Sequence, residues 1–384
     1  AVSKTITVLA TKPSLATQLG LHVGVVAHAL WLIGFWFVVV RHVALSKNGL
    51  PIMGILGLSL TQQFPDMSTI KPDVLLVMPL PPYARAQIDA LYTAHDRTHM
   101  TDPAAFAKVA PNIRAIVGSG EAKVPRELMA QMPNLKMVSV IGVGYDGVDT
   151  AAANELGIKV THTPDVLNDD VADLAIGLML CAARRLPQAD QYVRQGQWLA
   201  KGPMALQRKV SGSRVGIVGM GRIGKTIAKR CAAFDMPISY TARSVKSDLP
   251  FAFYSNAQEL AANVDFLVVI TPGGAATKGM INAEVLAALG KDGYLINVAR
   301  GTVVDQAALI EALQNKTIAG AGLDVFDGEP TVPEAFFALD NVTLLPHVGS
   351  ATTDTRKAMA DLALLNLANF YADKPLVTVV PECQ

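Results

Sequence analysis

Three stretches near the end of the chain place acid–base and ion-pairing residues directly after short apolar runs. Arg300 ends NVARG, Asp324 and Glu329 lie in LDVFDGEP, and His347 lies in LPHVGSAT. If each run is a strand of one parallel sheet, all three stretches lie at its carboxyl edge, where open α/β folds bind ligands. One such histidine or arginine would ordinarily be structural. Polar residues at three equivalent strand ends indicate a site capable of acid–base chemistry.

The stretch GMGRIG adds a dinucleotide-binding pattern. It follows the apolar run RVGIV and precedes a helical pattern, the context that makes G-x-G-x-x-G specific. The first glycine allows a tight turn, the second lets the backbone approach a pyrophosphate, and the third lets helix and strand pack closely. The pyrophosphate then lies at a helix N-terminus. The predicted cofactor loop consists of Gly219, Met220, Gly221, Arg222, Ile223 and Gly224.

The strand after this loop selects the nicotinamide cofactor. An NAD site has an Asp or Glu at the end of that strand to hold the ribose 2′-OH, but the sequence here is PISYTARSVK and contains no acid. Arg243, Ser244 and Lys246 would instead bind a 2′-phosphate through charge-assisted hydrogen bonds. The sequence therefore predicts NADP, as NADPH, against the alternative of a solvated basic turn.

Two sheets are needed to position these residues. After residue 66, short apolar runs alternate with helical stretches, which is typical of parallel strands covered on both faces. The strands predicted for a first series are 73–81, 114–118, 137–144 and 159–163; those for a second series are 214–219, 238–242, 264–271, 294–298, 322–325 and 343–345. We expect an α/β protein with two doubly wound (Rossmann/flavodoxin-like) parallel-sheet domains and an active-site cleft between them.

The order of the elements predicts a discontinuous first domain. A long apolar helix at 168–186 separates the two series, and a final helix at about 355–371 comes too late for the second sheet. We expect that final helix to return to the first sheet. The predicted division is a substrate-binding domain at 67–165 plus 349–384 and an NADP-binding Rossmann domain at 166–348.

The first 66 residues differ from the rest in composition. The 384-residue chain is 17% charged, but residues 1–66 carry only five charged side chains and 19–40 carry none. A helix over 19–40 would be about 33 Å long, enough to cross a hydrocarbon core of about 30 Å. Because every chemical motif lies further along the chain, we expect residues 1–66 to be an apolar extension outside the enzyme body. Membrane contact is expected only if 19–40 is a genuine anchor.

Charge and cysteine content argue against several other classes of protein. The net charge is +1, so no strong field favours nucleic acid as a partner. Cys181, Cys231 and Cys383 are far apart and odd in number, which suggests neither a disulfide framework nor a zinc site. No metal is expected, and this cysteine usage fits the reducing cytoplasm.

Six stretches together resemble the D-isomer-specific 2-hydroxyacid dehydrogenase family. They are VGYDGVD, TPDVLNDDVADLAIGLML, GMGRIG, NVARG, LDVFDGEP and LPHVGSAT, in the family's order and spacing. The resemblance covers about residues 71–379 and is strongest to the NADPH-dependent glyoxylate, hydroxypyruvate and hydroxyphenylpyruvate reductases. It implies an oxidoreductase that transfers hydride from NADPH to the C2 carbonyl of glyoxylate or hydroxypyruvate, giving a D-2-hydroxyacid. An aryl pyruvate such as hydroxyphenylpyruvate is the alternative substrate.

The resemblance also implies a role for each catalytic residue. Arg300 matches the arginine that pairs with the substrate carboxylate and polarises the carbonyl. His347 matches the proton donor to the carbonyl oxygen, and Glu329 matches the acid that hydrogen-bonds that histidine. A glutamate at this position separates the chain from the family's formate dehydrogenases, which carry a glutamine and have no carbonyl to protonate.

Further positions are implied for the two ligands. Val143 and Gly144 match a loop whose N–H groups bind the substrate carboxylate, together with Arg300 and His347. Asp324 matches a residue on the nicotinamide side of the cofactor. The other cofactor-lining positions are Thr271, Val298, Ala299 and Arg300.

One alternative of another class stays open. The chain could be a nucleotide-sensing interaction protein with little turnover, although the complete set of Arg300, Glu329 and His347 argues against it. Members of the family are typically homodimers, and residues 192–199 lie where their contact usually forms. We therefore expect a homodimer with a small-molecule 2-oxoacid as its substrate.

Overall fold

The structure is a computed structural model that describes residues 44–45, 51–52 and 71–384. The chain divides into two units, Ala1–Met67 and Ser68–Gln384. In the first unit, β1 (Ala44–Leu45) pairs antiparallel with β2 (Pro51–Ile52). The apolar segment 19–40 lies outside the described residues. Among the helices that are described, none combines the length and apolar character that a bilayer span requires.

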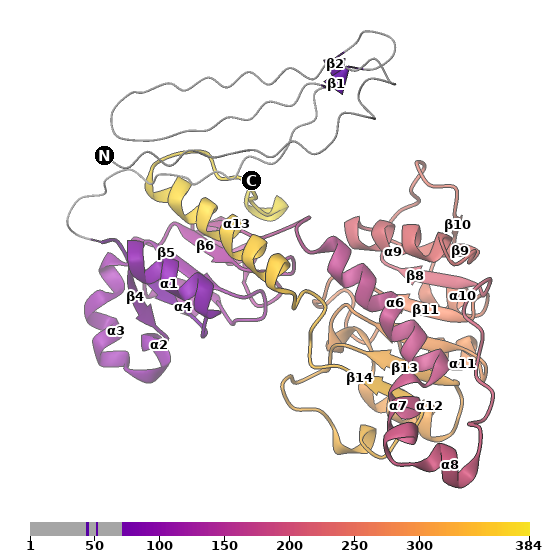
Figure 1. Cartoon of the computed structure of the whole chain (residues 1–384). Coiled ribbons are helices and arrows are strands. Elements are labelled where there is room, and N and C mark those ends of the chain that lie inside the picture. Colours follow the sequence, from indigo (N-terminus) through magenta and orange to yellow (C-terminus); the bar gives the residue numbers. More distant parts are fainter. Residues whose placement is uncertain (1–43, 46–50, 53–70) are drawn as a thin grey trace, which may run out of the picture. The chain divides into compact units, whose positions relative to one another are not determined.

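The unit Ser68–Gln384 contains two parallel sheets (Figure 1). The first has the strand order β4-β3-β5-β6-β7, and every pair in it is parallel. Its strands are β3 (Asp73–Leu76), β4 (Thr93–Asp96), β5 (Ala115–Gly118), β6 (Met137–Val140) and β7 (Lys159–Thr161). The sequence did not predict β4, because its residues TAHD form no apolar run and are only partly buried at the sheet edge.

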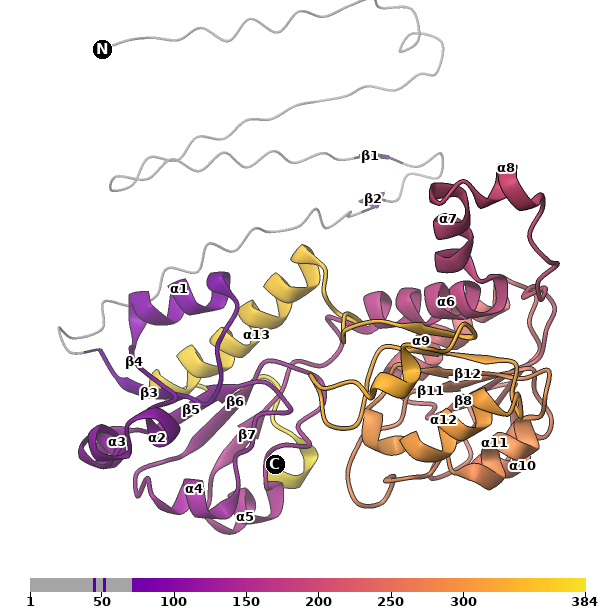
Figure 2. The same ribbon diagram turned by 90° about the horizontal axis from the view of Figure 1, so that it is seen from below.

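Helices on this sheet come from both ends of the unit. The final helix, α13 (Thr353–Tyr371), packs on α1 and β6 (Figure 2). The Ser139 hydroxyl donates to the Ala363 carbonyl at 3.2 Å, so the last helix returns to the first sheet as expected. The other helices here are α1 (Pro82–Leu91), α2 (Thr98–Thr101), α3 (Pro103–Val109), α4 (Arg126–Ala130) and α5 (Thr150–Glu155).

The second sheet has the order β10-β9-β8-β11-β12-β13-β14, again with every pair parallel. This is the dinucleotide-binding order with one further strand. The strands are β8 (Val215–Val218), β9 (Ile238–Thr241), β10 (Ala252–Phe253), β11 (Phe266–Val269), β12 (Tyr294–Asn297), β13 (Gly320–Leu323) and β14 (Val342–Leu344). The sequence did not predict β10, which is only two residues long and not fully buried.

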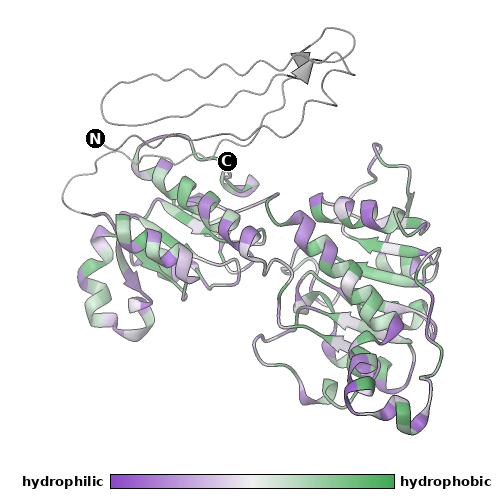
Figure 3. Ribbon diagram, in the orientation of Figure 1, coloured by the Kyte–Doolittle hydropathy of each residue, from purple (hydrophilic) through white to green (hydrophobic). Residues whose placement is uncertain are grey.

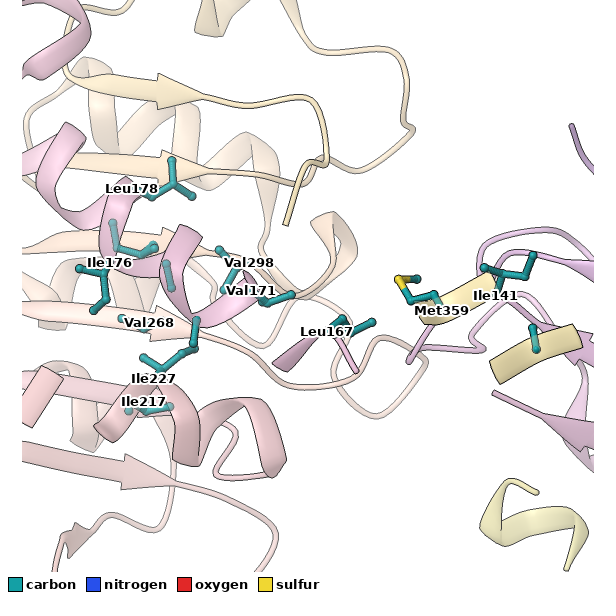
Figure 4. Close-up of a cluster of buried hydrophobic side chains, with 14 of the residues drawn as sticks. Ile141, Leu167, Val171, Ile176, Leu178, Ile217, Ile227, Val268, Val298 and Met359 are labelled. Atoms are coloured by element: carbon teal, nitrogen blue, oxygen red, sulfur yellow. The ribbon is translucent and has the colours of Figure 1, made fainter. Parts of the chain in front are cut away.

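The helix α6 (Asn168–Arg184) covers one face of this sheet. Its apolar side chains, among them Val171 and Ile176, belong to the same buried cluster as Val268 and Val298 (Figure 4). A Cβ at Gly322 of β13 would lie 3.1 Å from the Leu178 Cβ. The close approach of α6 to the sheet therefore depends on a glycine in β13.

The remaining helices belong to the second half of the unit and differ in how their N-termini are capped. They are α7 (Leu186–Arg194), α8 (Gln197–Lys201), α9 (Arg222–Ala232), α10 (Ala257–Ala261), α11 (Ala283–Leu289) and α12 (Gln306–Gln314). Asn256, Asn282 and Asp305 cap α10, α11 and α12 with side-chain oxygens. In contrast, the N-cap of α9 is Gly221, which has no side chain that could accept the free N–H groups of the first turn. Figure 3 shows hydrophobic residues along strands of the second sheet.

Candidate active site

His347 and Glu329 form a hydrogen-bonded pair in the loops that follow β14 and β13. His347 Nδ1 donates to Glu329 Oε2 at 2.7 Å. The other carboxylate oxygen of Glu329 accepts the Phe326 N–H at 2.7 Å. Glu329 is thus anchored at one oxygen and engages the imidazole with the other, which leaves Nε2 of His347 for proton transfer.

Each member of this pair favours the charged form of the other. The pKa of His347 is raised, chiefly by the hydrogen bond to Glu329, although burial and the charge of Arg300 oppose the shift. Burial pushes the pKa of Glu329 upward, but the hydrogen bonds from His347 and Phe326 outweigh it, so that pKa lies below its usual value. An imidazolium beside a carboxylate is the state that a general acid needs before it protonates a carbonyl.

A second carboxylate reaches the same imidazole nitrogen. Glu121 Oε1 lies 3.3 Å from His347 Nδ1, and Glu121 comes from the loop after β5 in the other sheet. The sequence patterns did not single out this glutamate. A loop between strands gives no sequence signal for which distant side chain it contacts.

Asp324 holds the backbone that presents His347. Its carboxylate accepts the N–H groups of Val348 at 2.7 Å and Gly349 at 2.8 Å, and its carbonyl accepts the His347 N–H at 2.8 Å. These bonds hold His347 at a φ of 54°, in the left-handed region that non-glycine residues seldom occupy. Burial raises the Asp324 pKa even though the two N–H groups lower it. The structure thus places this carboxylate on the histidine loop, and its predicted contact with the cofactor stays a prediction.

Arg300 is held by a residue from the first sheet. Its Nε donates to Asp146 Oδ2 at 2.6 Å, and its Nη1 donates to the Ala299 carbonyl at 2.8 Å. Asp146 belongs to the motif VGYDGVD, but sequence reasoning did not give it a role. The guanidinium is therefore fixed at two of its three nitrogens, Nε by a carboxylate and Nη1 by a carbonyl.

Two glycines make room for the Arg300 side chain. A Cβ at Gly144 would lie 2.0 Å from Arg300 Nη2, and a Cβ at Gly273 would lie 2.9 Å from its Cγ. Val143, which precedes Gly144, is also held in place, because its carbonyl accepts the His162 ring N–H at 2.9 Å. The structure thus brings Arg300 against the 143–144 loop, two parts of the predicted substrate site. The cleft expected between the two domains stays a prediction.

The three glycines of the cofactor loop differ in what surrounds them. A Cβ at Gly219, whose φ is 106°, would lie 2.8 Å from the Ile270 carbonyl oxygen. One at Gly224 would lie 2.1 Å from the Gly219 carbonyl oxygen, whereas one at Gly221 would meet no atom within 4 Å. The open position lies at the N-terminus of α9, whose first turn has no acidic residue. These residues fit the pyrophosphate of a dinucleotide.

The residues between these glycines have ordinary structural surroundings. Met220 is buried, and Ile223 is partly buried against the same core. Arg222 pairs with Asp165 at 3.1 Å, and both side chains are mostly exposed.

The basic turn after β9 lies next to the glycine loop. The Thr241 carbonyl accepts the Gly219 N–H at 2.9 Å, which ties the end of β9 to the loop. Arg243 and Ser244 are exposed beyond this point, and the Lys246 N–H donates to the Tyr240 hydroxyl at 2.7 Å. These positions are open to an anionic group such as a 2′-phosphate.

An acidic residue in the same turn, Asp248, has its charge offset by an ion pair. Asp248 pairs with Lys225 of α9 at 2.6 Å, which limits its repulsion of a phosphate. On the other side of the loop, the Thr271 N–H lies 2.9 Å from where a Gly219 Cβ would be, and Val298 and Ala299 are buried after β12. The predicted cofactor-lining residues therefore follow neighbouring strands of one sheet edge.

Known proteins match this chain in sequence and in structure. The family profile described as D-isomer specific 2-hydroxyacid dehydrogenase, NAD binding domain, matches residues 176–349. A hydroxyphenylpyruvate reductase from Plectranthus scutellarioides is 48% identical over 310 residues, which cover 80% of this chain and 98% of that protein. A glyoxylate/hydroxypyruvate reductase from Arabidopsis thaliana is 49% identical over 269 residues, covering 70% and 86% respectively.

Solved structures agree with the fold. The NADPH-dependent glyoxylate/hydroxypyruvate reductase from Sinorhizobium meliloti, in complex with NADP and malonate, matches with a TM-score of 0.77 at 44% identity. The match covers 82% of this chain and 98% of that one. The α/β architecture with two parallel sheets, predicted from the sequence, is confirmed.

Proposed function

The chain belongs to the D-isomer-specific 2-hydroxyacid dehydrogenases, and we propose that it reduces a small 2-oxoacid to a D-2-hydroxyacid with NADPH. Glyoxylate and hydroxypyruvate are the proposed substrates. The observation that carries the proposal is the His347–Glu329 hydrogen bond of 2.7 Å, which supplies a charged proton donor on the same sheet edge as a fixed cation. The relatives named glyoxylate/hydroxypyruvate reductases support the choice of substrate.

The proposed mechanism assigns substrate binding to Arg300. Its Nη2 lies against Gly144, so a substrate carboxylate can pair with the guanidinium while accepting N–H groups of Val143 and Gly144. The fixed charge also polarises the C2 carbonyl toward reduction. Asp146 keeps the fork in this orientation through Arg300 Nε.

His347 then provides the proton. NADPH supplies, when bound, the hydride that adds to C2 of the substrate. The carbonyl oxygen takes the proton from Nε2 of His347, which becomes neutral, and Glu329 keeps the ring oriented through Nδ1. The product hydroxyl thus gains one proton for each hydride transferred.

The proposed cofactor site uses two chemical features. The Gly219–Gly224 loop and the open N-terminus of α9 receive the pyrophosphate, and Arg243, Ser244 and Lys246 receive the 2′-phosphate. The remaining proposed lining residues are Thr271, Val298, Ala299, Arg300 and Asp324. The relative from Sinorhizobium meliloti, which is NADPH-dependent, supports this choice of cofactor.

Replacing His347 tests the mechanism. The variant His347→Gln should lose about 10²- to 10⁴-fold in kcat for 2-oxoacid reduction, the usual range for a general acid. Its NADPH affinity, measured by fluorescence titration, should stay unchanged. Undiminished turnover in this variant would mean that another group donates the proton.

Hydroxyphenylpyruvate is a second candidate substrate. It is favoured by the 48% identity to a hydroxyphenylpyruvate reductase, 98% of which is covered. Comparing kcat/KM for glyoxylate, hydroxypyruvate and hydroxyphenylpyruvate with NADPH separates the two substrate classes. Nucleotide sensing without turnover is less well supported, since it would not require the complete set of Arg300, Glu329 and His347.

Three further proposals concern the organisation of the protein. We propose a substrate-binding domain at 67–165 plus 349–384, an NADP-binding domain at 166–348, and residues 1–66 as a separate extension. We propose a homodimer, which the exposed Val193, Trp198 and Leu199 on α7 and α8 support. The three free cysteines support a cytoplasmic location.

A further inference from the structure

Two carboxylates, those of Glu329 and Glu121, lie within ion-pair distance of the His347 imidazole. Glu121 Oε1 lies 3.3 Å from His347 Nδ1, the nitrogen that donates to Glu329 at 2.7 Å. Among residues 71–384, Glu121 forms an ion pair with one basic side chain, that of His347. The two carboxylates come from different sheets, Glu329 from the loop after β13 and Glu121 from the loop after β5.

Close packing between two loops fixes the backbone on which Glu121 lies. The Gly147 N–H donates to the Gly120 carbonyl at 2.7 Å. A Cβ at Gly120 would lie 1.8 Å from the Gly144 carbonyl oxygen, so a larger residue beside Glu121 would push the loops apart. The contact with His347 therefore rests on a packed loop pair.

We infer that Glu121 is a positioning residue for proton transfer, an inference that rests on the proposed reductase function. Its carboxylate holds the His347 imidazole in the charged form from the side of the first sheet, in addition to Glu329. Because Glu121 and Glu329 lie in loops of different sheets, residues from both sheets stabilise the charged imidazole. Glu121 does not touch the carbonyl in this proposal and acts only through the imidazole.

The charges around His347 agree with this role. The Glu329 hydrogen bond raises the His347 pKa most, burial opposes it, and the charge of Glu121 raises it further, while Arg300 lowers it. The nearby Asp324 carboxylate is engaged with backbone N–H groups. The side chain of Glu121 is 48% exposed against 26% for Glu329, so solvent screens it more and its effect should be the smaller one.

The sign of the effect follows from the proton that reduction consumes. A protonated His347 is needed, so activity falls as pH rises through the pKa of that residue. Removing the Glu121 charge lowers this pKa, which leaves activity unchanged at low pH and reduces it at high pH. An exposed ion pair changes an equilibrium by about 1.5- to 5-fold, and this is the expected loss in kcat/KM above the transition.

The experiment measures kcat/KM for hydroxypyruvate reduction with saturating NADPH from about pH 5.5 to 9.5, a range that brackets an ordinary histidine pKa. The variants are Glu121→Gln and Glu121→Asp, with Glu127→Gln as the matched control. Glu127 is an exposed glutamate in α4, close in sequence but not paired with His347. Glu329→Gln serves as the positive reference.

The inference predicts a pH-dependent ratio of variant to wild-type kcat/KM. For Glu121→Gln the ratio should be near unity at low pH and fall at high pH, by less than the ratio for Glu329→Gln. Glu121→Asp should lose less activity at high pH than Glu121→Gln. The control Glu127→Gln should keep a ratio near unity at every pH. High salt should shrink the Glu121→Gln effect. If the ratio is flat for Glu121→Gln while the Glu329→Gln profile shifts, the positioning role of Glu121 is overturned and the proposed reductase function stands. Flat ratios for both variants mean that neither carboxylate controls the charge of His347, whereas undiminished turnover in His347→Gln would overturn His347 as the acid.

Discussion

Asp146 accepts a hydrogen bond from Arg300 Nε at 2.6 Å, although 154 positions separate the two residues in the chain. The loop after β6 thereby holds a guanidinium that the other sheet supplies. With Nη1 bonded to the Ala299 carbonyl, Nη2 beside Gly144 stays without a partner among residues 71–384 and is available to a substrate carboxylate. The orientation of the proposed substrate-binding cation therefore depends on the loop after β6 of the first sheet.

Replacing Asp146 should weaken substrate binding. In Asp146→Asn a neutral amide oxygen replaces the carboxylate that accepts from Arg300 Nε, so the bond is weaker and the guanidinium is held less firmly beside Gly144. Because a whole hydrogen bond to a charged group contributes about 1.5–3 kcal/mol and the variant keeps part of it, KM for the 2-oxoacid should rise by up to about tenfold. Steady-state kinetics give KM, and the NADPH dissociation constant should not change.

A matched control separates this effect from a general loss of charge. Asp292 is exposed near the opposite end of β12 and pairs only with its neighbour Lys291 in the described structure. Asp292→Asn should leave KM unchanged. If Asp146→Asn behaved in the same way, Arg300 would not need Asp146 for its orientation.

Replacing Glu329 should move the pH profile of the reaction. The carboxylate raises the pKa of His347, so Glu329→Gln should lower that pKa and move the alkaline fall of reduction to lower pH. Oxidation of the D-2-hydroxyacid needs neutral His347, so its activity should begin to rise at lower pH. At high pH the loss in kcat/KM for reduction should be about tenfold or more, as expected for a bond between charged groups.

Profiles in both directions distinguish this role from a merely structural one. A structural defect would lower both activities by the same factor at every pH. If the reductive profile kept its position in Glu329→Gln, the glutamate would not control the charge of His347.

Two glycines of the cofactor loop should respond differently to alanine. A Cβ at Gly221 meets no protein atom within 4 Å, whereas a Cβ at Gly224 would lie 2.1 Å from a carbonyl oxygen. Gly221→Ala should therefore keep its melting temperature but bind NADPH more weakly, because the methyl group enters the space proposed for the pyrophosphate. Gly224→Ala should lose about 1–3 kcal/mol of stability, the cost of overpacking.

Thermal denaturation and NADPH titration of the two variants make this comparison direct. An equal loss of stability in both variants would show that the space at Gly221 is needed for folding. Unchanged NADPH affinity in Gly221→Ala would remove the pyrophosphate from that position.

The sequence predicted best what local patterns determine. The glycine loop is read from its spacing between a strand and a helix, and Arg300, Glu329 and His347 each follow an apolar run. The strands β4 and β10 were missed, because a polar edge strand and a two-residue strand produce no apolar run. Their pairing depends on neighbours in the sheet.

The residues missed in the site have a common cause. Asp146 and Glu121 belong to loops of the first sheet, and each contacts a residue of the second. Such contacts depend on how two separately wound sheets pack, for which sequence spacing carries no information. Asp324 was predicted inside a strand at 322–325 but directly follows β13, which ends at Leu323. Its carboxylate binds the backbone of the histidine loop, a contact for which the sequence spacing gave no signal.

The central claim, an NADPH-dependent reductase of small 2-oxoacids, is tested most directly by kcat/KM with the two nicotinamide cofactors. Glyoxylate and hydroxypyruvate would each be reduced with NADPH and with NADH under identical conditions. Charge-assisted bonds from the Arg243 turn to the 2′-phosphate should favour NADPH by about tenfold or more. An equal or higher kcat/KM with NADH, or no turnover of either substrate, would contradict the account.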